Sequence, residues 1–274
     1  MATNAEKGDG HRNSEVKYRK NNTVLSQLGS TSVDKNLRNM TQTDLNKKIY
    51  QIIPIKYLFE IIENEQIYLK KVIEWDDPYE NFFLRSKFTL NGKEVSNKNV
   101  SEHIYGQCWS LFKDSDAMWR IYSRDEKSVR ITTTIRKLYD VVYNNSDMAY
   151  LSYIGNIKYK QKKQLFEWIK KMPQIDMGNI QQYAVDSLFY KRNNFSHEKE
   201  FRVIFINDSE CADLKFVNYK INALDFIDAV AFDPRAKEEY VDEQRERLKA
   251  KGFSLGKVSK SSLYKFKPLK VELL

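Results

Sequence analysis

Two carboxylates and a guanidinium occupy alternate positions of one short segment, as Glu198, Glu200 and Arg202 within "NNFSHEKEFRVIFIND" at 193–208. Side chains in a β-strand alternate between the two faces, so these three would share one face while Phe201 occupies the other. The apolar "VIFI" that follows predicts that both faces are covered further along. Partial burial raises the pKa of a carboxyl group unless a nearby cation keeps it ionised. The pattern indicates a catalytic carboxylate with a helper; the alternative is a solvated edge strand with weak ion pairs.

Two further segments carry residue types that could contact a ligand. "EWDDPYE" at 74–80 has the composition of a turn, and a capped loop is the alternative to ligand contact. In "CWSLFKDSDAMWRIYS" at 108–123, Ser110 ends a predicted strand. Trp119 and Tyr122 lie three residues apart on one face of the predicted helix that follows. Packing in the core is the alternative for these aromatic residues.

The charge of the chain favours an anionic partner. Its 274 residues hold 46 Lys and Arg against 37 Asp and Glu, a formal net charge of +9. Basic stretches interleaved with aromatic residues, at 157–172 and 245–270, suit a phosphate backbone with stacked bases. Solvated Lys-rich surfaces are the alternative. The predicted substrate-binding residues are Lys160, Lys162, Lys163 and Lys191.

Several functional classes are disfavoured by the sequence. Its two cysteines and three histidines do not fall into metal-ligand spacings, so we expect no metal site. No glycine-rich phosphate loop is present, which argues against kinase or Rossmann chemistry. The amino-terminal segment lacks the apolar run of a secretion signal, and no stretch is long enough to span a membrane. We therefore expect a cytoplasmic protein.

The pattern of apolar residues predicts an α+β fold with an irregular, mostly antiparallel sheet and helices inserted between its strands. Residues 1–46 are polar, and we expect them to form a flexible N-terminal extension to a single domain at 47–274. Strands are predicted at 49–53, 67–72, 103–112, 128–135, 150–159, 198–206, 214–221, 226–234 and 262–266. Helices are predicted at 55–66, 114–123, 160–172, 179–193 and 236–252, the last capped by Gly252.

The order and spacing of these motifs resemble a large bacterial family described as a domain of unknown function. The resemblance covers residues 48–270, and its motifs are "IYQIIP", "DDPYE", "CWSLF", "MWRIY" and "KRNNFSHEKEFRV". They contain Tyr50, Ser110, Trp119, Tyr122, Lys191, Glu198, Glu200 and Arg202. The chain departs from the family pattern at Asp76, where Asn is usual, and at Arg130 in a segment where a Gly commonly precedes the strand.

That layout in turn is similar to the ADP-ribosyltransferase fold, which implies a split sheet and NAD as a substrate, without a metal. The resemblance implies that Glu200 stabilises the ribosyl cation and that Glu198 orients or deprotonates the nucleophile. The cofactor-binding residues it implies are Tyr50, Ser110, Trp119 and Tyr122 around the nucleotide, with Arg130 or Arg202 on the pyrophosphate.

The resemblance further implies a toxin or anti-phage defence effector that is held in check by an antitoxin or another control partner. As acceptor, nucleic acid and RNA in particular is favoured over protein. Two other classes remain open. One is a non-catalytic, basic nucleic-acid-binding module. The other is a metal-dependent nuclease that uses Asp76, Asp77, Glu80, Glu198 and Glu200.

Overall fold

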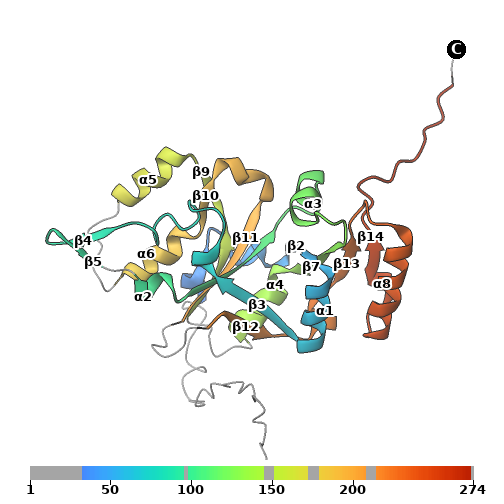
Figure 1. Ribbon diagram of the computed structural model, residues 1–274, viewed down its shortest axis with the longest axis horizontal. Helices are drawn as coiled ribbons and strands as arrows, with labels where there is room; N and C mark the ends of the chain where they lie inside the picture. Colours follow the sequence, from blue (N-terminus) through green and yellow to red (C-terminus); the bar gives the residue numbers. More distant parts are fainter. Residues whose placement is uncertain (1–32, 96–97, 145–150, 172–178, 208–213, 273–274) are drawn as a thin grey trace, which may run out of the picture.

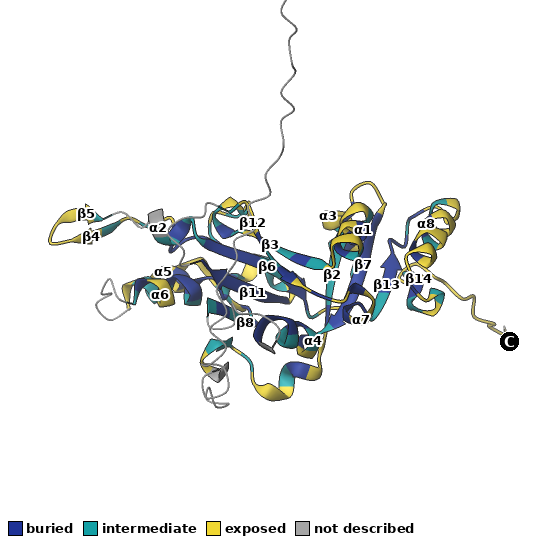
Figure 2. Cartoon of the chain, turned by 90° about the horizontal axis from the view of Figure 1, so that it is seen from below, coloured by how far each residue is buried: buried dark blue, intermediate teal, exposed yellow. Residues whose placement is uncertain are grey.

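The protein folds as a mixed helix and sheet structure with a mostly antiparallel sheet, as its sequence predicts (Figure 1). The structure is a computed structural model that describes residues 33–95, 98–144, 151–171, 179–207 and 214–272. Within these ranges no helix is long and apolar enough to cross a membrane. Figure 2 shows buried strands through the middle of the molecule and exposed helix faces around them.

The strands follow the chain in the order of their labels. They are β1 (Leu37–Arg38), β2 (Lys48–Pro54), β3 (Gln66–Lys71), β4 (Phe88–Leu90), β5 (Lys93–Val95), β6 (Ile104–Ser110), β7 (Ser128–Thr134), β8 (Ser152–Asn156), β9 (Lys158–Lys160), β10 (Tyr190–Arg192), β11 (Glu200–Ile206), β12 (Phe216–Lys220), β13 (Ala229–Phe232) and β14 (Val258–Lys260). The helices are α1 (Ile55–Asn64), α2 (Lys98–Ser101), α3 (Asp116–Tyr122), α4 (Ile135–Tyr139), α5 (Lys162–Lys170), α6 (Ile180–Ser187), α7 (Ala223–Phe226) and α8 (Glu238–Ala250).

The main sheet has ten strands among the described residues, in the order β1-β8-β11-β6-β2-β7-β13-β14, with β3 and β12 branching from β6. Its inner pairs are antiparallel, and the parallel pairs β1–β8 and β13–β14 lie at its two ends. Strand β11 lies between β8 and β6. It is therefore a central strand, and the alternative of a solvated edge strand is wrong.

The alternation along β11 places its side chains in two separate cores. Phe201 and Val203 belong to the larger core, whereas Ile204 and Ile206 belong to the smaller one. Every residue of the strand is buried. The prediction that both faces of this strand are covered is thus confirmed, because side chains on each face have an apolar layer to pack against.

The sheet splits along one edge of β6. Strand β2 pairs with this edge at Ser110, and β3 pairs with it at Tyr105 and Gly106. Neither strand pairs with residues 107–109 between these points. The amide Nε2 of Gln51 donates to the carbonyl of Cys108 instead, at 2.9 Å. Since β2 and β3 diverge here, with α1 connecting them, the sheet leaves room for a cavity.

Local sequence signals explain several helix ends. The hydroxyl of Ser115 accepts a hydrogen bond from the Met118 N–H at 3.1 Å, so Ser115 is the N-cap of α3. Glu65 follows α1 in the left-handed region, with φ of 50°. Gly252, with φ of 90°, follows the end of α8, where a glycine tolerates this conformation.

Two predicted elements differ from the structure. The strand predicted at 262–266 is wrong: the last strand is β14, and Leu263 and Phe266 are exposed, so the alternation there has no core to face. The helix predicted at 179–193 ends at Ser187, and β10 then pairs in parallel with β9. Pairing with a neighbouring strand overrides the local pattern in this segment.

Part of the predicted N-terminal extension packs on the domain. Residues 1–32 lie outside the described residues, so the prediction for them stays a prediction. Leu45 is 1% exposed and belongs to the larger core, and β1 pairs with β8. A side chain at Gly155 of β8 could not be accommodated, because its Cβ would lie 2.0 Å from the carbonyl oxygen of Arg38.

We therefore expect Gly155→Ala to force β1 away from β8 and to lower the free energy of unfolding by about 1–3 kcal/mol. Urea denaturation would measure the loss, and faster amide exchange at Leu37 and Arg38 would locate it. Gly256→Ala is the matched control, because its nearest neighbour is Ser254 Oγ at 3.6 Å. Equal stability of the two variants would contradict the close approach of β1.

Candidate active site

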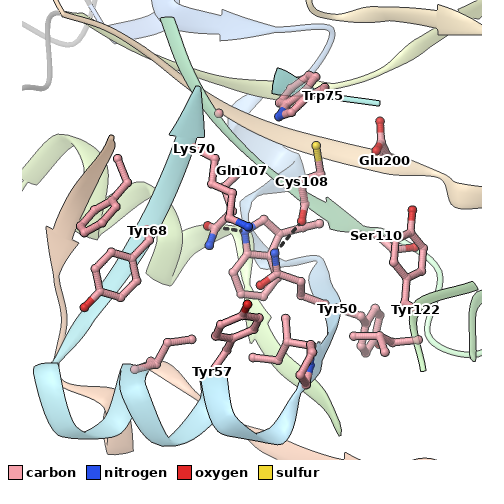
Figure 3. Close-up of a pocket in the computed structure, with 18 of the residues that line it drawn as sticks. Tyr50, Tyr57, Tyr68, Lys70, Trp75, Gln107, Cys108, Ser110, Tyr122 and Glu200 are labelled. Carbon is pink, nitrogen blue, oxygen red and sulfur yellow. Dashed lines mark hydrogen bonds between the residues drawn. The ribbon is translucent and has the colours of Figure 1, made fainter. Parts of the chain in front are cut away.

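A cavity of about 830 Å³ lies where β2, β3 and β6 diverge (Figure 3). This volume lies in the usual range for small-molecule sites, roughly 300–1,000 Å³. Five of the residues predicted from the sequence line it, namely Tyr50, Ser110, Tyr122, Glu198 and Glu200. Further lining residues come from α1, β3, the segment after β3, and β12.

Three of these residues form one row across three neighbouring strands. Ser110 of β6 is the register partner of Glu200 on one side and of Tyr50 on the other. Directly opposed residues of antiparallel strands have their side chains on the same face of the sheet. The row therefore presents an aromatic ring, a hydroxyl and a carboxylate to the same cavity.

Glu198 reaches the site by a different route from the one predicted. It is the last residue of a 3₁₀ helix, Asn193–Glu198, and Lys199 after it has φ of 46°. The strand begins only at Glu200, so the prediction that both carboxylates lie on one strand face is wrong. The Ser110 hydroxyl donates to the Glu198 carbonyl at 2.7 Å and fixes this bend to β6.

A buried ionic cluster joins both carboxylates. The ammonium of Lys191 lies 2.5 Å from Glu198 Oε2, 2.9 Å from Glu80 Oε1 and 3.4 Å from Glu200 Oε1. Arg202 Nη2 lies 2.5 Å from Glu80 Oε2 and 2.6 Å from Glu200 Oε2. Three carboxylates thus share two cations. When all five groups are ionised, one formal negative charge remains beside the cavity.

Neighbouring groups hold this cluster in place. The Arg202 guanidinium lies 4.5 Å from the centre of the Trp75 ring, and its Nη1 donates to the carbonyl of Leu188 at 2.7 Å. The backbone N–H of Glu200 donates to the Tyr159 hydroxyl at 2.8 Å. Buried charges persist only where hydrogen bonds and opposite charges compensate their lost hydration.

The two carboxyl groups have opposite pKa shifts. Burial raises the pKa of Glu198, and the Lys191 charge only partly offsets this effect. Burial acts in the same direction on Glu200, but the charges of Arg202 and Lys191 outweigh it and lower the Glu200 pKa. Tyr122 donates its hydroxyl proton to Glu198 Oε1 at 3.3 Å, and burial raises the Tyr122 pKa. The site thus holds one firmly ionised carboxylate beside a more basic one.

Three residues predicted to contact the cofactor lie behind the cavity wall. Arg130 is buried, pairs with Asp114 at 2.7 Å and lies 5.5 Å from the Tyr50 ring centre. Trp119 is fully buried and donates its Nε1–H to Asp114. Arg202 is fully buried against carboxylates. Arg202 supports Glu200 and Arg130 lies against the Tyr50 ring, while Arg130 Nε has no hydrogen-bond partner among the described residues.

The predicted substrate-binding lysines fall into two groups. Lys162 and Lys163 are exposed on α5, and Lys160 is half-buried on the adjacent β9. Lys191 is different, because it is buried in the ionic cluster and cannot reach a phosphate backbone on the surface. Its position in β10, beside β9, nevertheless connects the basic surface to the site.

Several residues contribute to the site in ways that the sequence did not predict; the nuclease alternative includes Glu80 only as a metal ligand. Glu80, at the end of "DDPYE", is the second anchor of both cations, and the spacing of that motif from the Lys and Arg gives no hint of this contact. Tyr57, Tyr68, Trp75 and Gln107 line the cavity, as do Lys70, Cys108 and Phe216. Their contribution depends on the divergence of β2 and β3, which no local pattern signals.

Two of the five acidic residues of the nuclease alternative lie outside the ionic cluster. Asp76 is exposed, and Asp77 pairs with Arg192 at 3.0 Å. Glu80, Glu198 and Glu200 face the two buried cations. Over the described residues, no group of three or more His, Cys, Asp or Glu side chains has an arrangement that could hold a metal ion.

Comparisons with known proteins give one family match and several similar structures. The family described as "Protein of unknown function (DUF2971)" matches residues 118–203. Thermus sp. 2.9 DarT in complex with ADP-ribosylated ssDNA is similar at 10% identity and a TM-score of 0.38, over 82% of this chain and 97% of that chain. The complex of the same protein with NAD+ has 12% identity and a TM-score of 0.36, over 79% and 96%. No curated protein matches the sequence. At these values the structural similarity carries no assignment of function.

The opposite pKa shifts predict different costs for removing each charge. Because the Glu200 pKa is lowered on folding, its ionisation adds stability above the unfolded value of roughly 4.3. This stability is lost as the pH falls through the folded pKa. Because the Glu198 pKa is raised, its charged form opposes folding at neutral pH.

We therefore expect Glu200→Gln to cost about 3–5 kcal/mol at pH 7, and Glu198→Gln clearly less. Denaturant unfolding from pH 3 to pH 7 would measure both. The Glu200→Gln variant should also lose less of its stability on acidification than the wild type. A larger loss for Glu198→Gln at pH 7 would contradict these assignments.

Proposed function

We propose that the protein is an ADP-ribosyltransferase that uses NAD as its substrate. The observation that carries this proposal is the row of Tyr50, Ser110 and Glu200 across β2, β6 and β11, which faces one cavity. The resemblance of the sequence motifs implied the same three residues for NAD binding and catalysis. The register supports it, because three segments far apart in the chain bring these side chains together.

The ionic state of Glu200 suits cleavage of the bond between nicotinamide and ribose. When this bond breaks, its electron pair leaves with the nicotinamide nitrogen and positive charge develops on the ribose. A fixed carboxylate stabilises such a cation, as in glycoside cleavage generally. Glu200 fulfils this role, since Arg202 and Lys191 keep its pKa low. The uncompensated negative charge of the ionic cluster also stabilises the positive charge that develops on the ribose.

Glu198 is suited to the second half of the reaction. The nucleophile forms a bond to the ribose carbon and gives up a proton, which a general base must accept. Burial raises the Glu198 pKa and makes its carboxylate a stronger base. Lys191 lies within 3.4 Å of both carboxylates and holds the base and the cation-stabilising group together.

The walls of the cavity provide surfaces for the rings of NAD. Tyr50 and Tyr122 both lie near Ser110 in Figure 3, and Trp75 lies across from them near Glu200. Arg130, 5.5 Å from the Tyr50 ring centre, restrains that ring from behind. Stacking on aromatic rings of restricted orientation binds flat ligands at low entropic cost.

For the acceptor, the basic surface of α5 and β9 favours nucleic acid, and we extend the proposal to RNA. The Lys162 ammonium lies 5.0 Å from the Tyr79 ring centre and 6.0 Å from that of Phe166. Arg192 contacts the same Tyr79 ring at 4.3 Å. Lysines interleaved with aromatic rings suit a single strand, whose phosphates and bases they would bind together.

Such an activity would damage the cell that makes it, so the proposal extends to a toxin or defence effector controlled by an antitoxin or similar partner. Its place of action would be the cytoplasm, where NAD and nucleic acid are both available. Protein as the acceptor and a non-catalytic binding module are the alternatives that the following experiments separate.

The catalytic assignment predicts that purified protein releases nicotinamide from NAD. Glu200→Asp keeps the charge that Arg202 needs but withdraws the carboxylate, so we expect turnover to fall by about 100-fold or more. Glu200→Gln should be at least as slow where it folds, as circular dichroism would show. Glu246→Gln, an exposed carboxylate of α8, is the control and should match the wild type. Wild-type protein that releases no nicotinamide would overturn the enzyme assignment in favour of the binding module.

The acceptor assignment predicts a separate effect of the basic surface. In Lys162→Ala/Lys163→Ala, we expect weaker binding of single-stranded RNA, with a salt dependence reduced by about two counterions. Nicotinamide release without acceptor should not change. The matched control is Lys48→Ala/Lys220→Ala, two exposed lysines outside both basic stretches. Incubation with adenylate-labelled NAD in a cell lysate then identifies the acceptor. Label on protein rather than on RNA would contradict the RNA assignment and select protein as the acceptor.

A further inference from the structure

The cavity has a second end, away from Glu198 and Glu200, that the proposed chemistry does not use. It is lined by Tyr57 of α1, by Tyr68 and Lys70 of β3, and by Phe216 of β12. Figure 3 shows Tyr57, Tyr68 and Lys70 on the opposite side of the cavity from Tyr122 and Glu200. This end thus combines aromatic rings with a cation.

The register of β3 and β12 explains why these side chains meet. Lys70 is the partner of Phe216, and Tyr68 lies two residues before Lys70, so all three share one face. The Tyr68 and Phe216 rings lie edge to face, with centres 5.2 Å apart and planes at 87°. An edge-to-face pair leaves the face of one ring open for a flat ligand.

The rings at this end are accessible although they are apolar. Phe216 is 45% exposed and Tyr57 is 40% exposed, yet both line a concave site. Asn64 Nδ2 donates to the Tyr68 hydroxyl at 3.0 Å, which fixes the orientation of that ring. Exposed aromatic side chains in a cavity with restricted orientation are typical of a binding surface for a planar group.

The charged groups at this end lie outside the ionic cluster. Lys70 and Lys215 line the cavity, and no ion pair involves either lysine in the part of the chain that the structure describes. Glu60 and Glu74 also line it and are exposed. Two mobile ammonium groups can hold a phosphate, while carboxylates accept hydrogen bonds from ribose hydroxyls.

The two ends are too far apart for one ring to contact both. Lys70 pairs with Gly106, and Glu200 pairs with Ser110, four residues further along the same strand β6. At about 3.3 Å per residue, these rows lie roughly 13 Å apart. A ligand that fills both ends must therefore be extended, with a ring at each end and a polar linker between them.

We propose that the β3–β12 end of the cavity is a nucleotide subsite. Tyr68, Phe216 and Tyr57 hold the base, and Lys70 and Lys215 hold its 5′-phosphate. The inference rests on the proposed function in so far as the same cavity binds NAD. One chemistry, a nucleoside 5′-phosphate, can come from two sources here: the adenylate half of NAD, or a nucleotide of the acceptor strand.

Calorimetric titration with adenosine monophosphate tests the subsite directly, without any need for turnover. Phe216→Ala and Lys70→Ala remove one ring and one cation from exposed positions, so the fold should be retained. We expect each to weaken adenosine monophosphate binding about tenfold. Binding of free nicotinamide, which has neither ribose nor phosphate, should not change. Phe266→Ala and Lys267→Ala, which are exposed and do not line the cavity, are the matched controls.

Kinetic measurements then show whether the nucleotide in the subsite belongs to NAD or to the acceptor strand. If the subsite holds the adenylate half of NAD, the same variants raise KM for NAD about tenfold at unchanged kcat. If it holds the acceptor, KM for NAD in the absence of acceptor stays constant, while labelling of RNA falls. Either result supports the subsite. Adenosine monophosphate that binds equally well to both variants, or does not bind the wild type at millimolar concentration, overturns it.

The proposed function can fail independently of this inference. Wild-type protein that binds adenosine monophosphate through Phe216 and Lys70, but releases no nicotinamide from NAD, would retain the subsite and lose the transferase assignment. The reverse result is nicotinamide release that depends on Glu200, while Phe216→Ala and Lys70→Ala affect the binding of neither adenosine monophosphate nor NAD. It would retain the transferase assignment and overturn the subsite.

Discussion

The compensation of the buried positive charge of Arg202 by carboxylates is the interaction on which the rest of the site depends. A fully buried guanidinium is tolerated only because Glu80 and Glu200 approach it to 2.5–2.6 Å and Leu188 accepts another of its hydrogen bonds. The same carboxylates bind Lys191, which then holds Glu198. The positions of both candidate catalytic groups therefore follow from the need to satisfy two buried cations.

The split of the sheet provides the space that this cluster faces. Strand β6 pairs with β11 along its whole length, but its other edge is shared between β2 and β3. A continuous sheet would have covered residues 107–109 and closed the cavity. Instead, the side chain of Gln51 donates to the Cys108 carbonyl, so this partly buried backbone acceptor keeps a partner where the sheet opens.

Much of the fold could be predicted from local patterns, whereas the contacts within the site could not. The continuous apolar run "VIFI" indicates a strand covered on both faces, and Ser115 marks the start of α3, because both depend on near neighbours in the sequence. The resemblance of motifs identified Tyr50, Ser110, Tyr122 and Glu200 as candidates that prove to line one cavity. The partner of Arg202 in "DDPYE" and the bend at Lys199 depend on long-range packing and on a single left-handed residue, which a strand pattern does not reveal.

The sequence separation within the ionic cluster has a consequence for how the chain folds. Glu80 and Arg202 are 122 positions apart, and their contact joins the segment after β3 to strand β11. Contacts of such high contact order form late, because the chain must first lose the entropy of closing a long loop. A nascent or partly folded chain therefore has the two carboxylates but not the cation arrangement that sets their charge states. Competence for chemistry would arise only together with the complete tertiary structure.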